Sequence, residues 1–104
     1  MKPYEIYIAY ISWGDGGKRR PVLVLREANA QVSILRITTQ YENKSAAVQS
    51  KYLAINDWKQ AGLHMPSYVD TSKIVNLPAA ILSNSPIGRL SDGDKQRLSD
   101  RAVM

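Results

Sequence analysis

The segment Tyr4–Ile11 is the feature that most restricts how this chain can fold, because nearly all of its side chains are aromatic, β-branched or otherwise apolar. In an extended strand successive side chains point to opposite faces, so both faces of this strand are apolar. Such a strand is buried on both sides, or covered on one side by a partner. A fold that contains it must supply that cover.

Further β-forming segments follow at close spacing. The sequence predicts strands over residues 21–25, 32–38 and 52–55, and a longer, bent strand over 67–77. Turn residues cluster at 13–17 and 27–29, and the polar segment 40–51 is predicted to be a loop. Short strands at this spacing, with a helix late in the chain, predict a mainly-β fold: a small, curled antiparallel barrel with helical appendages.

Two helices are expected. Asn56 is predicted to cap a brief helix over 57–61 that ends at Gly62. The segment Ser91–Asp94 resembles a capping box and predicts the start of a C-terminal helix with Leu98 on its apolar face.

Length and composition narrow the class of protein. With 104 residues the chain is long enough for one modest core, so we expect a single domain over 1–104. No segment approaches the ~20 apolar residues that span a bilayer, and no leader peptide is visible, so we expect a cytoplasmic protein without a membrane partner. Cysteine is absent, which excludes disulfides and thiolate chemistry. The net charge of +5 favours an anionic partner such as nucleic acid or an acidic peptide.

Several residues allow both a functional and a structural interpretation. His64 is the only histidine, and without cysteine nearby it predicts no metal site, so a structural or solvated role is favoured. Trp13 and Trp58 could stack on bases, although packing in a core or an interface is at least as well supported. The terminal helix carries basic side chains that are typical of a solvated face: Lys95, Arg97 and Arg101. None of these features decides function.

The segment Gly16–Leu25 places three cations directly before a buried strand. Arg19 and Arg20 are neighbours in extended backbone, so their side chains point to opposite faces, and at most one can enter a site on a given face. Pro21 keeps Arg20 out of helical geometry, which holds its guanidinium in a defined direction. From the residues alone, two roles are open for Arg20: it either forms a bidentate hydrogen bond with a phosphate or pairs with a carboxylate at the surface.

Five segments follow one another over nearly the whole chain: Lys2-Pro3, Gly16–Leu25, Ile37–Gln40, Ala61–Leu63 with Pro66-Ser67, and Ile87–Asp92. In this order they resemble the MazF/PemK family of type II toxins, close to its short PemK-like branch. The resemblance implies an SH3-like β-barrel, a homodimer, and an acidic antitoxin that blocks the toxin and binds DNA in complex with it. It also implies metal-independent, sequence-specific cleavage of single-stranded RNA by the 2′-hydroxyl of the RNA, without a cofactor.

The resemblance further assigns site residues. In the family the arginine directly before the Pro-Val-Leu-Val strand is catalytic, and here that residue is Arg20. The threonine that ends the next long strand, in the family's Ile-Thr signature, is Thr38. Arg36 shares a strand face with Thr38 by the period of two, and a phosphate contact and a carboxylate partner are equal alternatives for it. The residues expected to bind RNA are Lys18, Arg19, Arg36 and Gln40.

The chain departs from the family pattern at three places. Tyr4-Glu5 replaces the usual Gly-Asp before the first strand, and the loop before Arg20 is short. Some members carry an arginine and an acidic residue in the strand after Pro66-Ser67. The nearest positions here are Asp70 and Ser72, so that version of the catalytic set is absent.

Two other classes of function stay open. The first is a non-catalytic barrel of the same fold that binds RNA or protein. The second is a gyrase poison of the related CcdB type. In CcdB-like proteins that function resides in a Trp-Gly-Ile terminus, whereas this chain ends in Arg101–Met104, so the second class is disfavoured.

Overall fold

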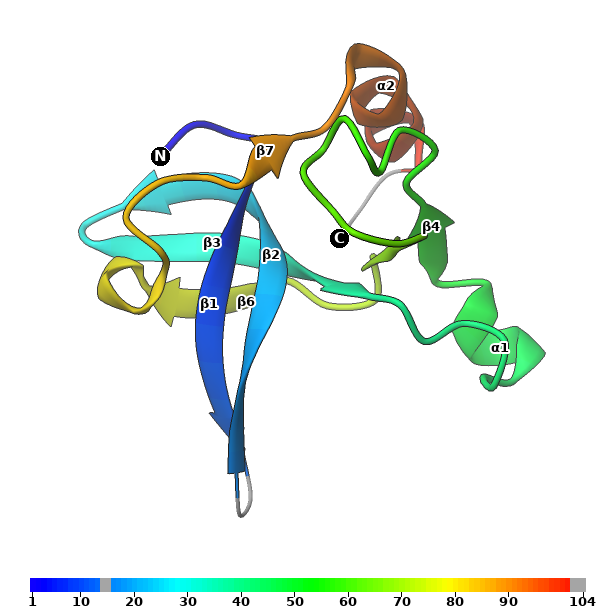
Figure 1. The fold of residues 1–104 in the computed structure, drawn as a ribbon, viewed down its shortest axis with the longest axis horizontal. Coiled ribbons are helices and arrows are strands. Elements are labelled where there is room, and N and C mark those ends of the chain that lie inside the picture. The colour runs from blue at the N-terminus through cyan, green and yellow to red at the C-terminus, as the bar shows by residue number, and fades with distance from the viewer. Residues whose placement is uncertain (14–15, 102–104) are drawn as a thin grey trace.

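The computed structural model describes residues 1–13 and 16–101, with only the backbone of Ser12, Trp13 and Gly16. Within these residues the chain is mainly β (Figure 1). The elements in chain order are β1 (Glu5–Trp13), β2 (Gly16–Ala28), β3 (Gln31–Thr38), α1 (Ala46–Gln49), β4 (Tyr52–Ala54), β5 (Tyr68–Asp70), β6 (Val75–Pro78), the 3-10 turn η1 (Ala79–Ile81), β7 (Gly88–Arg89) and α2 (Asp92–Asp100).

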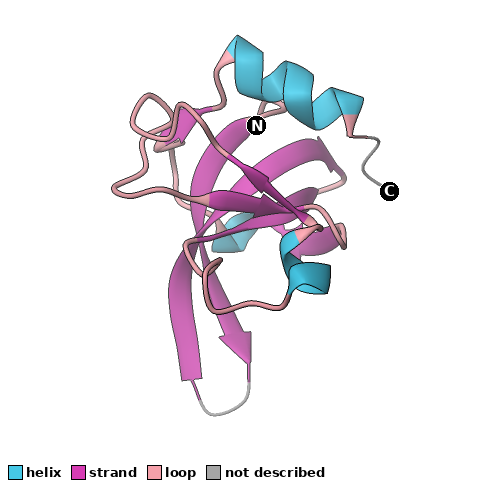
Figure 2. Ribbon diagram, turned by 90° about the vertical axis from the view of Figure 1, so that its right-hand side faces the viewer, coloured by secondary structure: helices cyan, strands magenta, loops and turns pink. Residues whose placement is uncertain are grey.

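The named strands pair antiparallel in one curled sheet. Its order is β4-β5-β3-β2-β1-β7, and β6 pairs with the first half of β3. Figure 2 shows α2 lying across one end of the strands. The predicted small antiparallel barrel is confirmed in the form of a curled half-barrel. In the described part of the chain no helix is long and apolar enough to cross a membrane.

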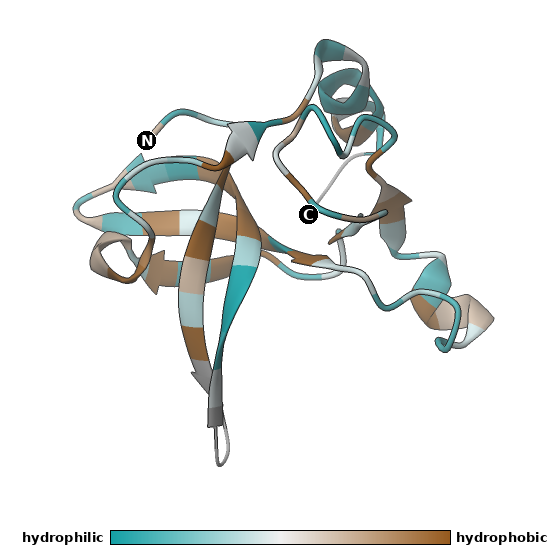
Figure 3. Cartoon of the chain, viewed as in Figure 1, coloured by the Kyte–Doolittle hydropathy of each residue, from teal (hydrophilic) through white to brown (hydrophobic). Residues whose placement is uncertain are grey.

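Two apolar clusters bury both faces of the central strands. Ile6 and Leu23 belong to one cluster, which α2 closes with Leu98. Tyr7 and Val22, one residue away in each strand, belong to the other cluster, which β6 and η1 cover. Figure 3 shows hydrophobic stretches along β1, β3 and β6 and a hydrophilic one on β2. Full burial of one such apolar side chain stabilises a fold by about 1.5–3 kcal/mol. The expected burial of the first strand on both sides is thus confirmed for its first half.

The predicted helix over 57–61 is wrong. This segment forms turns: the Ala61 N–H donates to the Asp57 carbonyl, at 3.0 Å, but the next bond, from Gly62 to Lys59, does not continue the α-helical pattern. The backbone N–H groups of Asn56 and Asp57 donate to the Asp94 carboxylate in α2, at 3.2 and 2.9 Å. Asp94 is only 2% exposed, so these hydrogen bonds hold the segment firmly against α2. Gly62 then reverses the chain with φ at 86°. The segment thus completes one helical turn, and Gly62 ends it before a helix of the predicted length can form.

Two further local predictions need correction. The expected loop over 40–51 contains α1, whose first turn is capped by the Ser45 hydroxyl. The expected bent strand over 67–77 is two strands, β5 and β6. Asp70 Oδ1 accepts hydrogen bonds from the backbone N–H and the hydroxyl of Ser72, at 2.9 and 2.5 Å. These bonds stabilise the bend that ends β5.

The long strands β1 and β2 extend into the predicted turns. Trp13 pairs with Gly16 across β1 and β2, and positions 14–15 of the expected turn 13–17 lie outside the described residues. The turn expected at 27–29 is formed by Asn29 and Ala30, with φ at 54° and 63°. Positive φ at both central residues is the mark of a type I′ turn, which prefers glycine at the second of them.

We predict that Ala30→Gly raises the free energy of unfolding by up to about 1 kcal/mol. The left-handed conformation costs an L-residue about 1–2 kcal/mol, and the greater freedom of glycine in the unfolded chain offsets part of that gain. Urea denaturation measures the change. Ala28→Gly, at the end of β2, is the control and should lower stability. Equal losses for both variants would contradict the turn geometry.

Candidate active site

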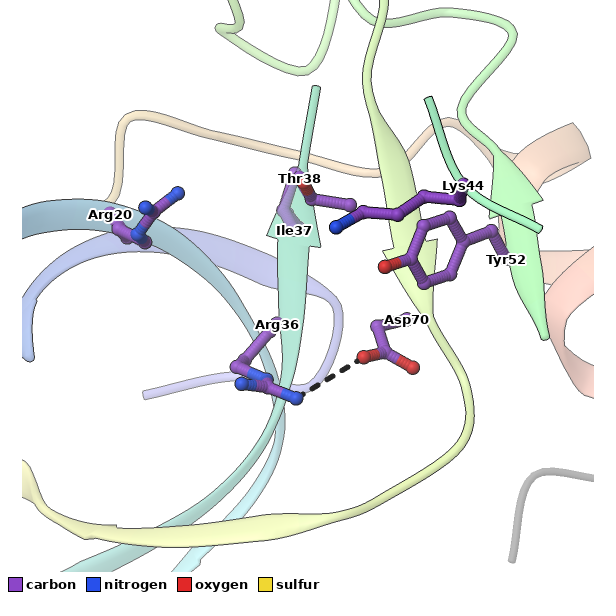
Figure 4. A pocket seen from close by; sticks show the side chains of 7 residues that line it. All are labelled: Arg20, Arg36, Ile37, Thr38, Lys44, Tyr52 and Asp70. Atoms are coloured by element: carbon purple, nitrogen blue, oxygen red, sulfur yellow. Dashed lines mark hydrogen bonds and ion pairs between the residues drawn. The ribbon is translucent and has the colours of Figure 1, made fainter. Parts of the chain in front are cut away.

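A pocket of about 290 Å³ lies where β2, β3, β5 and β4 adjoin (Figure 4). Its lining residues are Arg20, Arg36, Ile37, Thr38, Lys44, Tyr52 and Asp70. In Figure 4 Arg20 lies on one side of β3, while Lys44 and Tyr52 lie on the other. Three cations and one carboxylate line this hollow, so it suits an anionic ligand.

Strand register brings the pocket residues to one face of the sheet. Tyr52 pairs with Asp70 across β4 and β5, and Thr38 pairs with Tyr68 across β3 and β5. Directly opposed residues of an antiparallel pair share a face. Arg36 shares that face with Thr38 because the two residues are two positions apart. The predicted pairing of Arg36 and Thr38 on one face is confirmed by the pocket that both line.

Arg20 and Arg19 face different hollows, as their alternation predicts. Val22 pairs with Arg36 across β2 and β3, and Arg20 points to the same face because it lies two residues before Val22. Arg20 is partly buried, whereas Arg19 is exposed and lines a second hollow. Lys18 is also exposed; it shares the face of Arg20 and does not line the pocket.

Thr38 is held by the loop that follows it. Its Oγ1 accepts a hydrogen bond from the backbone N–H of Gln40, at 3.0 Å. The Gln40 side-chain oxygen in turn accepts from Asn43 Nδ2, at 3.2 Å. The Thr38 hydroxyl can still donate its own proton to an acceptor in the pocket. Gln40, expected to bind RNA, is thus seen to orient the threonine.

Arg36 forms an ion pair within the pocket. Its Nη2 lies 3.3 Å from Asp70 Oδ2, and the two side chains are 49% and 12% exposed. Ser72 holds the other carboxylate oxygen, so Asp70 is a fixed anchor for the guanidinium. Of the two alternatives left open for Arg36, the carboxylate partner is present. The half-exposed guanidinium can still offer N–H groups to a phosphate.

The sequence did not predict four of the pocket residues: the apolar Ile37 and the polar Lys44, Tyr52 and Asp70. The sequence contained an indication for Asp70, because this residue follows Pro66-Ser67 in the strand where some family members place charged catalytic residues. Lys44 and Tyr52 had none. They lie in a polar loop and a short strand, and only the pairing of β4 with β5 brings this part of the chain to the pocket.

The other candidate residues have structural surroundings. Arg97 donates to the Ala54 carbonyl at 2.8 Å, and Arg101 donates to the carbonyls of Ser50 and Tyr52, so these two arginines cover the edge of β4. The expected solvated face of the terminal helix is wrong for them. Trp58 packs against the apolar cluster closed by α2, and His64 is exposed. Among the described residues no group of three His, Cys, Asp or Glu side chains could hold a metal ion.

The family model described as PemK-like, MazF-like toxin of type II toxin-antitoxin system matches residues 2–102. The chain belongs to this family of toxins. Its fold is similar to that of the Mycobacterium tuberculosis toxin MazF-mt6, with a TM-score of 0.71 and 24% identity over 92% of this chain and 89% of that chain. It is also similar to an endoribonuclease from a mycobacterial species in complex with its cognate antitoxin, with a TM-score of 0.61 and 16% identity over 94% and 86% of the two chains. No curated protein matches the toxin in sequence.

We predict that Thr38→Val lowers the free energy of unfolding of this toxin by about 0.5–1.5 kcal/mol, because it removes the acceptor for the Gln40 N–H. Thr38→Ser retains a hydroxyl at this position and should stay within a few tenths of a kcal/mol of the wild type, by the same accounting. Chemical denaturation of the three proteins measures the difference. If valine and serine were equally tolerated, the hydrogen bond would not contribute to holding the loop.

Proposed function

We propose that this toxin is a metal-independent endoribonuclease that cleaves single-stranded RNA at short sequence motifs. The observation that carries the proposal is the convergence of Arg20 and Thr38, the two residues the family pattern marks as catalytic, in one cationic pocket. One solved structure of the same fold is an endoribonuclease, which supports the reaction class.

The reaction uses the nucleophile that RNA supplies. The 2′-hydroxyl beside the scissile phosphate attacks the phosphorus, its proton leaves, and the bond to the 5′-oxygen of the next nucleotide breaks as that oxygen takes up a proton. The products carry a 2′,3′-cyclic phosphate on one side and a free 5′-hydroxyl on the other. DNA lacks the attacking hydroxyl, so the enzyme cleaves RNA alone.

Arg20 and Thr38 stabilise the charge that builds up on the phosphoryl oxygens. The Arg20 guanidinium is a fixed, two-pronged donor that suits a phosphate, and it carries no lone pair with which to act as a general base. The Thr38 hydroxyl, whose oxygen already accepts from Gln40, donates its proton to a second phosphate oxygen. Both groups thus act as hydrogen-bond donors to the phosphoryl oxygens.

The remaining cations hold the RNA backbone around the scissile phosphate. Arg36, anchored by Asp70, and Lys44 line the same pocket, and Lys18 extends the positive surface along β2. Gln40 acts mainly through the orientation of Thr38. Arg19 lies on the other face and makes the weakest contribution.

The same positive surface is the proposed site for an acidic antitoxin segment. A disordered acidic segment that orders on binding gains electrostatic attraction from the pocket cations and covers the phosphate site. The endoribonuclease of similar fold was solved with its cognate antitoxin, which supports a partner of this kind. Binding of operator DNA by the resulting complex belongs to the same proposal.

A homodimer completes the proposed assembly, with the RNA groove along or near its interface. Ile8 lines a hollow of about 420 Å³ with apolar neighbours such as Met65, and Thr39, next to Thr38 in the chain, lines the same hollow. Met65 and Tyr10 are 52% and 57% exposed. An apolar surface of this kind on a small domain is typical of a protein interface.

The test of catalysis compares Arg20→Ala and Arg20→Lys with the wild type on a long mixed-sequence RNA in EDTA, with the new 5′ ends mapped. Loss of one preorganised donor should slow cleavage by about 10²–10³-fold. Lysine keeps the positive charge but cannot donate two parallel hydrogen bonds to a phosphate. Arg20→Lys should therefore bind RNA but restore little cleavage. Arg26→Ala, an exposed arginine further along β2, is the control and should cleave normally.

Melting curves of the same preparations separate catalysis from folding. If Arg20→Ala only lowered the melting temperature and kept its specific activity, the catalytic assignment would be wrong. If the wild type bound RNA without cleaving it in EDTA, the non-catalytic binding barrel would be the correct reading.

We predict that light scattering at micromolar concentration gives a mass near twice 11.6 kDa for the wild type. Met65→Glu places a charge in the apolar hollow and should yield a monomer, since burying an unpaired carboxylate is costly. Val48→Glu is the matched control, because Val48 is exposed in α1, outside this hollow, and this variant should stay dimeric. A monomeric wild type would refute the assembly.

A further inference from the structure

Three tyrosines gather beside the pocket. The rings of Tyr41 and Tyr68 are stacked, with centroids 4.4 Å apart and planes inclined by 8°. Tyr52 lies 6.4 Å from Tyr41 with its plane tilted by 42°. We call Tyr41, Tyr52 and Tyr68 the tyrosine cluster. Its members come from the loop after β3, from β4 and from β5, so only the folded sheet brings them together.

The tyrosine cluster borders the proposed phosphate site. Tyr68 pairs with Thr38 across β3 and β5, so the two side chains stand next to each other on one face. Tyr52 itself lines the pocket together with Arg20 and Thr38. In Figure 4 the Tyr52 ring lies between Lys44 and Asp70 with its hydroxyl directed toward β3. A ligand whose phosphate occupies the pocket therefore has these rings beside it.

The cluster is separate from the hydrophobic core. Neither apolar cluster of the described residues, nor the side chains packed against them, includes any of the three rings. All three are partly exposed. Aromatic rings that stack on one another at the surface, next to a cationic pocket, form the arrangement that single-stranded nucleic acid uses for base stacking.

The position of Tyr41 is fixed by its backbone. Its carbonyl accepts hydrogen bonds from the backbone N–H of Lys44, at 3.0 Å, and from Gln49 Nε2, at 2.8 Å. The backbone of Tyr41 is therefore held by the loop and by α1, and its ring stacks on Tyr68. A ring that is already ordered loses little conformational freedom when a planar ligand packs on it.

We propose that the tyrosine cluster is a base-stacking subsite, which takes the nucleobase of the nucleotide beside the scissile phosphate. The inference rests on the proposed RNA-cleaving function and extends it from the phosphate to the neighbouring base. A nucleotide carries its base one sugar away from its phosphate, which matches rings that adjoin the pocket. Every base has a flat face, so the subsite adds affinity and orients the RNA without reading sequence.

The test measures equilibrium binding of two fluorescein-labelled, single-stranded DNA oligonucleotides by anisotropy. One has a mixed sequence, and the other has the same length but abasic sugars throughout, so their phosphates are matched. DNA lacks the 2′-hydroxyl and stays intact during the measurement. Tyr41→Leu keeps an apolar side chain over Tyr68 but has no flat face, and Tyr41→Phe keeps the ring as the control.

The wild type should bind the oligonucleotide with bases more tightly than the abasic one. Tyr41→Leu should weaken binding of the first by about 5- to 150-fold, the effect of losing one stacked base, and leave binding of the second unchanged. Tyr41→Phe should match the wild type on both. Tyr68→Leu, at a residue of the cluster that does not line the pocket, provides a second variant with the same expected pattern, and melting curves identify any variant that fails to fold.

Opposite results would separate this inference from the proposed function. If a folded Tyr41→Leu and a folded Tyr68→Leu bound both oligonucleotides as the wild type does, or lost affinity for both equally, the stacking subsite would be refuted while RNA cleavage stood. If the wild type bound neither oligonucleotide and cleaved no RNA, the proposed function would fail and the subsite with it.

Discussion

Burial of strand β2 on both faces is the constraint on which the fold and the site depend. Val22 and Leu23 are each 0% exposed and belong to different apolar clusters, so each face of the strand has its own set of core contacts. A slip of one residue would exchange the side chains between the two clusters, disrupt the packing of both, and turn Arg20 to the opposite face. The register of β2 is therefore strongly specified, and with it the face to which Arg20 points.

The pocket is a polar extension of the same arrangement. Across β3, β5 and β4 the row Ile37, Val69 and Leu53 faces the core, and the adjoining row of Arg36, Asp70 and Tyr52 faces the pocket. Core packing on one face thus positions the charged side chains on the other. Side-chain hydrogen bonds add precision, because Asp70 anchors Arg36 and the Gln40 N–H anchors Thr38. A site built in this way is ordered before a ligand arrives, which favours electrostatic stabilisation.

Local sequence patterns predicted the long strands well and the short elements poorly. β1, β2 and β3 are rich in β-branched and apolar residues, so propensity and burial favour the same structure. The helix predicted over 57–61 was wrong because the segment completes only one helical turn, from the Asp57 carbonyl to the Ala61 N–H, before Gly62 reverses the chain. The strand predicted over 67–77 is divided after Asp70, because the Asp70 carboxylate accepts hydrogen bonds from Ser72 and stabilises a bend there. Short elements have few residues of their own, so one contact decides their form.

The same distinction between local sequence pattern and tertiary contact applies to the site residues. The sequence by itself determined family membership, the extended backbone at Arg20 and the opposite directions of Arg19 and Arg20, since these follow from motif order, from proline and from the period of two. Only the tertiary structure decided that Arg20 and Thr38 share a pocket with Lys44 and Asp70, and that Tyr41, Tyr52 and Tyr68 lie beside it. Those contacts join residues far apart in sequence, and the physical reason is strand pairing: cross-strand neighbours are set by the register of the whole sheet, which no local pattern contains.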